Sequence, residues 1–435
     1  MTDFSKDSDS VQMRIDGTGE VLKLWSEYSY TSEFLEPTDD WSFSIGDPNL
    51  ARDWVPKLPP MTRVTLEING LPTCAGYVKG WEIVAARGGG RAMRVTGFDA
   101  LGPMVRSGVD PLLKFTAGMS LLDLITTVAS KFGFRVIATT DVVNRKIVTG
   151  GALVARVTGR EIKYVSPDTY GTTTGSVTKL VSDGGSADLK AMTLQQAQPH
   201  PAEGAFEFLA RHCKRFGLWL WASPLGDTLT VGRPDFDQEP LYSIHDGSYI
   251  DAKFAASGND QPTVIIADGK VRGDPNFPKA ISKIAMINEL TGLDAHGKIR
   301  SKVQAIINSR KGCKVLPLRP QVTEWSRYFP AQSDDCVTAM YMHDDESTSI
   351  VQLEGYVRKE MGVRQGKALS YHVTVEDHVN SSHVWAVNTT CRLDDRQTGA
   401  SGVWWIRSRT LTKSRGGGTM TSLEMVPTYL LEIGK

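Results

Sequence analysis

The stretch Val64-Thr65-Leu66-Glu67-Ile68-Asn69-Gly70 decides how the first hundred residues fold. Its apolar side chains occupy alternate positions, which indicates a β-strand with one buried face. Asn69-Gly70 follows at once, and this pair is a strong hairpin signal because both turn positions need positive φ. The sequence therefore predicts an antiparallel hairpin here.

The chain continues this pattern beyond the hairpin. A second strand is expected through residues 77–84, which include Trp81. The turn Arg87-Gly88-Gly89-Gly90 then leads into a third strand at residues 93–96. Together these segments predict a three-stranded antiparallel meander.

The last hundred residues repeat that plan. Residues 369–375 alternate apolar and polar side chains, and residues 389–393 lead to a polar turn at 394–399. A strand with two tryptophans at 403–406 runs on to Arg415-Gly416-Gly417-Gly418 and returns through 420–426. Two unrelated glycine loops are one interpretation, but the matching order of flanking elements favours a duplicated β-barrel domain.

Two helices with similar endings lie between these regions. The first begins at Ser120 with Asp123 as its capping box, and the second opens after Pro201. They stop at Gly133 and Gly217, and each is followed by a strand. On the second helix the predicted buried face is Phe206, Leu209, Ala210 and Cys213, and the predicted wet face is Arg211, Lys214 and Arg215. A further helix is expected within residues 294–311.

The predicted fold is mainly β with an α/β middle part: two tail-tube-like antiparallel β-barrel domains, a small α/β domain and an inserted domain. The expected divisions are an N-terminal barrel at 1–107, an α/β domain at 108–240 with a flexible insertion near 140–195, an inserted domain at 241–330 and a C-terminal barrel at 331–435. Residues 166–188 and 255–279 carry many loop-forming residues and are expected to be exposed loops or segments ordered by a neighbour.

Composition narrows the possible functions. The 435 residues carry 49 basic and 49 acidic side chains, so the net charge of zero argues against a protein that coats nucleic acid, although not against a passive DNA channel. Five cysteines without a C-x-x-C pair make a disulfide framework or zinc site an unlikely expectation. The polar N-terminus is not expected to be a signal peptide, and no apolar run reaches the roughly 20 residues of a membrane span.

Motifs for catalysis are weak. The glycine runs lack the Gly-Lys-Ser/Thr ending of a phosphate loop, and neither Gly-x-Ser-x-Gly nor His-Glu-x-x-His occurs. His372, His378 and His383 with Asp377 form the best metal candidate, but surface and turn histidines are the preferred interpretation. Asp344-Asp345-Glu346 lacks the oxygen spacing of a calcium loop and is expected to be a solvated turn. No cofactor and no enzymatic activity are predicted.

The segment Val95-Thr96-Gly97-Phe98-Asp99-Ala100-Leu101-Gly102-Pro103-Met104-Val105, followed by Val109-Asp110-Pro111, resembles the baseplate hub proteins of Mu-like contractile phages. Phe98 stands where an arginine is common in that family. The helix near 119–132, residues 198–231, Val384-Trp385-Ala386-Val387-Asn388 and the last glycine hairpin are also similar. The matching positions are Gly97, Asp99, Asp110, Pro111, Glu203, Phe206, Leu209, Trp385 and Asn388.

The resemblance implies a homotrimer in which each subunit contributes two tube-like barrels, so that six similar barrels form a torus. Such a ring would stack on the tail tube protein, seat the central spike protein and be surrounded by baseplate wedge proteins. DNA would only pass through it, and no membrane insertion is expected. The implied location is the virion tail baseplate, assembled in the host cytoplasm. The family is also similar to the spike-loading proteins of type VI secretion.

Two other function classes stay open at this level. A peptidoglycan hydrolase on the same hub would need a carboxylic acid of raised pKa and a second carboxylate across a cleft. A carbohydrate-binding protein would use exposed tryptophans, whereas Trp81, Trp219 and Trp405 lie in strands where core positions are expected.

Overall fold

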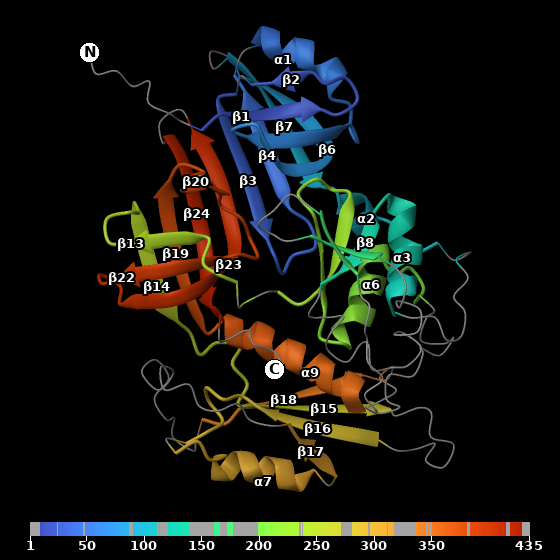
Figure 1. The fold of residues 1–435 in the computed structure, drawn as a ribbon, viewed down its shortest axis with the longest axis vertical. Coiled ribbons are helices and arrows are strands. Elements are labelled where there is room, and N and C mark those ends of the chain that lie inside the picture. The colour runs from blue at the N-terminus through green and yellow to red at the C-terminus, as the bar shows by residue number, and fades with distance from the viewer. Residues whose placement is uncertain are drawn as a thin grey trace.

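The computed structural model places most of the chain in four regions (Figure 1). The described residues are 9–23, 25–46, 48–86, 90–110, 113, 121–139, 161–165, 172–176, 199–234, 236, 238–270, 281–294, 296–310, 312–316, 336–344, 347, 350–380, 383–414 and 418–428. Most of the predicted insertion at 140–195, and most of the predicted loop at 166–188 within it, lies outside them. The exceptions are β9 (Glu161–Val165) and β10 (Thr172–Ser176), which pair antiparallel.

The N-terminal β unit contains the predicted meander. Its strands are β1 (Val11–Ile15), β2 (Val21–Leu22), β3 (Glu27–Glu33), β4 (Asp40–Ile45), β5 (Arg63–Ile68), β6 (Leu71–Ala86) and β7 (Gly90–Asp99). The prediction is confirmed, because β5 pairs with β6 and β6 with β7, both antiparallel. At the hairpin, Asn69 and Gly70 have φ of 52° and 79°, as the turn requires. The helices α1 (Pro48–Trp54) and η1 (Val55–Lys57) lie between β4 and β5.

The C-terminal β unit has the second predicted meander. It comprises β13 (Tyr242–His245), β14 (Asp251–Ala256), β19 (Leu369–Glu376), β22 (Thr390–Asp395), β23 (Ala400–Ser414) and β24 (Gly418–Pro427), with the short pair β20 (Val379–Asn380) and β21 (His383–Val384) beside them. Residues 242–256 were assigned to the inserted domain from the sequence. Instead β13 pairs with β22 and β14 with β19, so this segment belongs to the C-terminal sheet.

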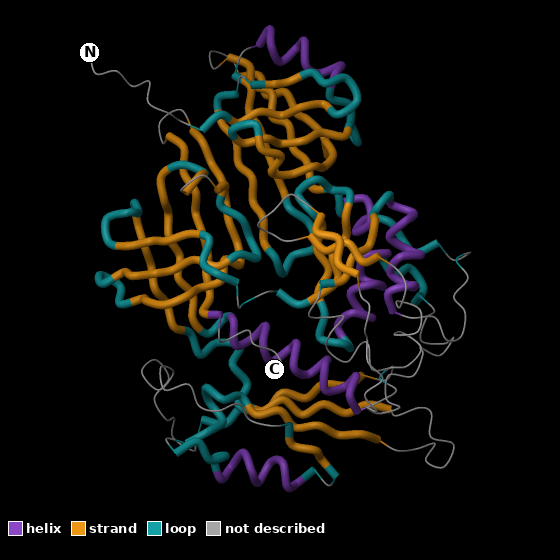
Figure 2. Tube along the Cα trace, in the orientation of Figure 1, coloured by secondary structure: helices purple, strands orange, loops and turns teal. Residues whose placement is uncertain are grey.

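One continuous sheet joins the two units (Figure 2). Its order is β14-β19-β24-β23-β3-β4-β7-β6-β5-β1-β2, and β22 and β13 extend it beside β23. The join is the antiparallel pair β23–β3. Neither unit closes into a barrel through the described pairings, which corrects the prediction of two barrels to two open, bent sheets that share a strand junction.

The predicted α/β part is present, and its residues lie between those of the two β units in the sequence. It contains α2 (Gly102–Arg106), α3 (Leu121–Ala129), η2 (Ser130–Phe132), β8 (Arg135–Ala138), α6 (Ala205–Lys214), β11 (Trp219–Ala222) and β12 (Thr228–Gly232). Strand β12 pairs parallel with β8 and antiparallel with β11. Both predicted stops are left-handed, with φ of 82° at Gly133 and 65° at Gly217. Ser120, the predicted cap of the first helix, lies outside the described residues.

The inserted unit is a four-stranded sheet between two helices. Its elements are β15 (Val264–Lys270), β16 (Ile281–Ile287), α7 (Ser301–Ser309), β17 (Cys313–Val315), β18 (Ala339–Asp344) and α9 (Ile350–Gly366). Helix α7 covers one face and α9 the other, and α9 lies against the rest of the molecule (Figure 1). The helix expected within 294–311 is confirmed as α7. Two expectations were wrong: 264–270 is a buried strand, not a loop, and 350–366 is a helix inside the predicted C-terminal barrel.

No helix in the described part of the chain is both long and apolar enough to cross a membrane.

Candidate assembly surface

Two long hairpins, one in each β unit, share their register and their irregularity. In β6–β7, three residue pairs precede a bulge at Lys79 and seven follow it. In β23–β24, three pairs precede a bulge at Arg407 and seven follow it. A bulge is a specific feature of a strand, since it adds one unpaired residue and bends the ladder. The two hairpins are therefore structural counterparts.

The match extends across five strands in each unit. The order β3-β4-β7-β6-β5 corresponds to β14-β19-β24-β23-β22, and every neighbouring pair in both sets is antiparallel. The correspondence ends at the outer side, where β1 lies antiparallel to β5 but β13 lies parallel to β22. The chain thus carries the same β unit twice, with different outer strands.

The strand junction between the two units is built around Leu411. The register of β23 against β3 runs from Ser408 opposite Glu33 to Lys413 opposite Tyr28, and Leu411 lies opposite Tyr30. Leu411 is 1% exposed and belongs to the apolar core of the N-terminal unit. A side chain of the C-terminal hairpin thus completes the core of the other unit.

Arg409 joins the same two units through polar contacts. Its guanidinium donates to the Trp385 carbonyl and, at 3.3 Å, to the Tyr30 hydroxyl, and it lies 5.1 Å from the centre of the Tyr30 ring. Since Arg409 is buried, these contacts replace part of the hydration that its charge would otherwise have.

Gly97 and Asp99, two of the family-like positions, lie at the end of β7. A Cβ at Gly97 would come within 1.9 Å of Cζ2 of Trp41, so the glycine leaves room for that ring. The Asp99 carboxylate accepts a hydrogen bond from the Leu101 N–H at 3.1 Å. Burial, then repulsion from Asp39, raises the pKa of Asp99 well above its ordinary value.

Trp385 and Asn388, two further family-like positions, lie in the segment before β22 and accept hydrogen bonds from side chains of β23. Trp385 is 1% exposed and its ring centre is 4.4 Å from that of Tyr242. Asn388 has a φ of 61°, a conformation that asparagine tolerates better than most residues, and its Oδ1 accepts from Nε1 of Trp405 at 3.2 Å. Both positions support the strand that carries Arg409.

Glu203 closes the entry to α6. Its carboxylate accepts from Nε and Nη2 of Arg211 at 2.6 and 2.8 Å and from the His200 N–H at 2.8 Å. Burial raises the pKa of Glu203, but the hydrogen bonds outweigh it and bring the pKa below its ordinary value. The carboxylate therefore stabilises the turn before α6 and the Arg211 side chain on it. Helix α6 begins at Ala205, later than predicted.

The buried face of α6 differs from the prediction. Leu209 and Cys213 are buried as expected, but Phe206 and Ala210 are only half-buried, while Phe208 and His212 are fully buried. Arg215, predicted to be wet, is 4% exposed and pairs with Asp344 at 3.6 Å. Asp110 lies beyond α2, and Pro111 is outside the described residues. The eight family-like positions that the structure describes form no common site, and all nine stay predicted structural positions.

The metal candidates do not converge. His378 is buried, and its ring contacts the Tyr28 hydroxyl and, at 3.0 Å, Oγ1 of Thr421. His372 is exposed on β19 and His383 is exposed on β21, while Asp377 occupies a turn with φ of 62°. No group of three or more potential ligands gathers among the described residues. Of the acidic run, Asp344 is described and takes part in the ion pair with Arg215, whereas 345 and 346 are not.

Asp39 and Asp99 form a half-buried carboxyl pair that the sequence did not predict. Burial raises the pKa of Asp39, and the Tyr30 hydroxyl, which donates to it at 2.6 Å, opposes this shift. The pair lies where the β3–β4 turn meets the end of β7, and the Asp99 N–H donates to the Asp39 carbonyl at 3.2 Å. Only the tertiary fold brings these two distant carboxyl groups together.

The outer half of β6 is exposed, contrary to the expectation for Trp81. Trp81, Ile83 and Val84 are 38%, 46% and 57% exposed, and Glu82 and Ala85 between and beyond them are exposed as well. Trp219 and Trp405 are buried, as predicted. Three exposed apolar side chains in one strand segment suggest an interaction surface.

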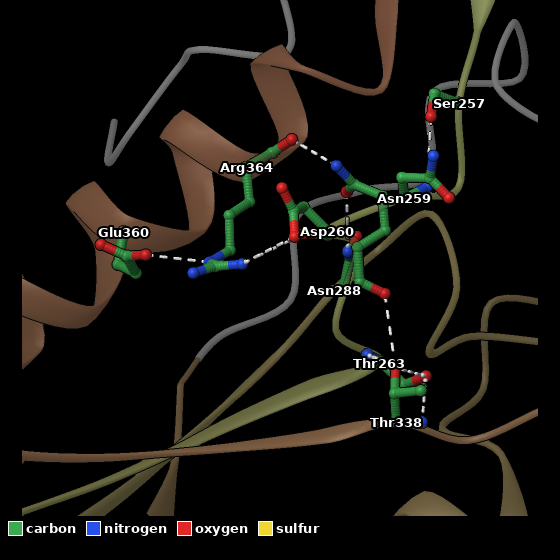
Figure 3. A network of polar contacts seen from close by, with 9 residues as sticks. Ser257, Asn259, Asp260, Thr263, Asn288, Thr338, Glu360 and Arg364 are labelled. Carbon is green, nitrogen blue, oxygen red and sulfur yellow. Dashed lines mark hydrogen bonds and ion pairs between the residues drawn. The ribbon is translucent and has the colours of Figure 1, made fainter.

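A polar network fixes the segment that leaves β14 (Figure 3). Gln261 donates to the Arg364 carbonyl on α9 and accepts from Nδ2 of Asn288 at 3.2 Å. Arg364 in turn donates to Glu360 at 2.8 Å, and Asn288 is fully buried. The inserted unit is therefore held firmly at the end of β14, beside the edge of the C-terminal sheet.

Comparison with known proteins gives the fold a context. No family model matches the sequence, and no curated protein matches it. The structure is similar to that of a tail protein from Neisseria meningitidis MC58, with a TM-score of 0.64 and 16% identity over 98% of this chain and 99% of that one. The 43 kDa tail protein of prophage MuSo2 from Shewanella oneidensis matches with a TM-score of 0.62 and 14% identity over 97% and 99%.

These two structural neighbours are tail proteins, one of them from a prophage, and the chain has their fold over almost its whole length. At the level of the fold, this agrees with the resemblance to a tail protein that the sequence indicated.

Proposed function

We propose that this chain is the structural hub of a contractile phage tail baseplate. Three copies form a ring of six similar β units, which joins a six-fold tail tube to a three-fold central spike. The observation that carries this proposal is the duplicated β unit with its matched bulges at Lys79 and Arg407. Two equivalent units per chain allow a three-fold assembly to present a six-fold surface.

The proposed partners follow from that geometry. One side of the ring contacts the tail tube protein, the other seats the spike, and wedge proteins surround it. DNA passes through the central opening as cargo, which suits a chain of zero net charge. The ring is assembled in the host cytoplasm and ends in the virion tail, without membrane insertion. A division into four domains stays a prediction within this proposal, with residues 242–256 in the C-terminal domain and residues 350–366 in the inserted domain.

Light scattering after size exclusion tests the ring. The expected mass is three times the 47.7 kDa of one chain, and negative-stain images should show three-fold symmetry with a central hole. A protein that stays monomeric at high concentration contradicts the proposal.

The rival function, a peptidoglycan hydrolase on the same hub, is favoured by one observation. Asp99 is a carboxyl group of raised pKa with a second carboxyl group, Asp39, beside it, and a glycosidase needs an acid of raised pKa together with a second carboxylate. Their hydrogen bonds to Tyr30 and to backbone N–H groups explain them as turn supports, so a non-enzymatic role is the conclusion. Zymography on host cell walls separates the two functions. Clearing by the native protein that disappears in Asp99→Asn would establish the hydrolase.

A further inference from the structure

We infer that the outer half of β6 pairs antiparallel with β14 of a second copy of this chain, in the register by which β23 pairs with β3 within one copy. The inference rests on the proposed ring and specifies its subunit contact strand by strand.

The internal junction supplies the template. Strand β23 is the counterpart of β6, and β3 is the counterpart of β14, because their neighbours and registers match. Within one chain β23 and β3 pair with each other. Their counterparts do not meet within the chain: in the described pairings, residues 80–86 are bonded only to β7, and β14 only to β19. In the described part of the chain, each copy thus has one free edge of each kind.

The template fixes the register between copies. Leu411 opposite Tyr30 becomes Ile83 opposite Phe254 of the second copy, and Thr412 opposite Ser29 becomes Val84 opposite Lys253. Since side chains alternate between the faces of a strand, a shift by one residue would reverse both faces.

The exposed side chains fit this register. Leu411 is 1% exposed because it enters the core of the N-terminal unit, whereas its counterpart Ile83 is 46% exposed. Phe254 and Ala252, on the inner face of β14, pack only partly buried against the core of the C-terminal unit. Pairing would place Ile83 over Phe254 as Leu411 lies over Tyr30, and it would cover apolar surface on both copies.

The outer face is complementary in charge. Glu82 would lie opposite Ala255 and diagonally from Lys253, within the range at which opposite charges on neighbouring strands attract. Unpaired strand edges offer rows of backbone donors and acceptors, so the two edges also satisfy each other's hydrogen bonds.

The contact joins two different surfaces, and such head-to-tail contacts form a ring when the rotation closes. Each copy gives its β6 edge to one neighbour and receives the β6 edge of the other on β14. The junctions inside and between copies then have the same strand pairing, which is the condition for six equivalent β units.

Disulfide trapping tests the register. The background is Cys336→Ser, which removes the exposed native cysteine. Val84→Cys with Lys253→Cys places two thiols on directly opposed residues, and opposed antiparallel Cα atoms at about 4.5–5.5 Å lie within disulfide range. Thr412→Cys with Ser29→Cys is the matched pair at the internal junction and should close within one chain. Val84→Cys with Ala252→Cys points the thiols to opposite faces.

Mild oxidation should link the Val84/Lys253 variant into covalent dimers and trimers on non-reducing gels, while the internal pair stays at the mass of one chain and the Ala252 pair does not link. A soluble trimer in which the internal pair closes but the Val84/Lys253 pair does not overturns the strand contact and leaves the ring. A native protein that is monomeric throughout overturns both.

A charge substitution provides an independent measurement. Ile83→Asp should raise the dissociation constant of the oligomer at least tenfold, because it places a carboxylate against the partner's Phe254. Leu71→Asp, at the other end of β6 and 41% exposed, should leave the oligomer intact. Equal effects of the two changes contradict the proposed contact.

Discussion

Replacing Leu411 by alanine is expected to destabilise the N-terminal β unit, although the residue belongs to the C-terminal hairpin. The change removes three carbon atoms from a site that is 1% exposed. At about 0.8 kcal/mol per buried methylene, the lost transfer free energy is about 2.4 kcal/mol, and the cavity adds to it. The expected loss of unfolding free energy is therefore about 2–5 kcal/mol.

Hydrogen exchange is the suitable assay, because a chain with several units need not unfold in one step. In Leu411→Ala, amides of β3 and β4 should lose protection, since the cavity opens opposite Tyr30 in the core that these strands share. Leu423→Ala is the matched control: Leu423 is equally buried but lies in the core of the C-terminal unit, so β19 and β24 should respond instead.

Thr412→Ala, one residue along on the outer face, should change stability by less than about 0.5 kcal/mol. If Leu411→Ala behaves like Thr412→Ala, or if its loss of protection is confined to β19 and β24, the two β units do not share a strand junction at Leu411.

Three further changes test other parts of the structure. Gly97→Ala should cost about 1–3 kcal/mol in chemical denaturation, because its Cβ would lie 1.9 Å from Cζ2 of Trp41; an unchanged midpoint contradicts the close approach. Burial lowers the pKa of His212 to about 2, so below pH 6.5 the unfolded chain binds a proton that the folded chain does not. The free energy of unfolding should therefore decrease as the pH is lowered, by up to about 1.4 kcal/mol per pH unit. His212→Leu should reduce that slope in urea titrations at pH 7 and pH 5. Burial raises the pKa of Asp395, but hydroxyl hydrogen bonds, one from Tyr371 at 2.8 Å, lower it to about 2, so the stability it gives is present above about pH 4 and lost as pH falls towards 2. Asp395→Asn should therefore be less stable than the native protein at pH 7 and lose less on acidification.

Local patterns in the sequence determined both meanders. Alternating side chains fixed which residues of β5 and β19 face inward, and Asn69-Gly70 fixed the first hairpin, because strand period and turn geometry depend on neighbours in the chain. The repeat of the Arg-Gly-Gly-Gly turn was enough to predict two similar units. The match of the bulges at Lys79 and Arg407 could not be read from the sequence, since a bulge appears only against its partner strand.

Helices with one solvent-exposed face could also be predicted from the sequence, whereas helices buried on several sides could not. Helix α9 packs on β15 and β16, yet its Lys359 donates to the Leu218 carbonyl at 2.6 Å and Lys214 of α6 lies 4.3 Å from the ring centre of its Tyr356. A helix with neighbours on opposite sides has no single apolar stripe, so its sequence lacks the usual helical period. Close packing on several sides likewise buries Arg215 and His212. A helix that packs on one side only would leave both side chains in contact with water.

The sequence by itself thus determined the strands and turns of the two meanders and their duplication, because these depend on residues close together in the chain. Only the tertiary structure decided that β13 and β14 join the C-terminal sheet, that β23 pairs with β3, and that Trp81 is exposed. Strand pairing between distant segments follows from which edges meet when the cores form, and residue spacing carries no record of it. The candidate assembly surface lies on two such edges, one in each half of the chain.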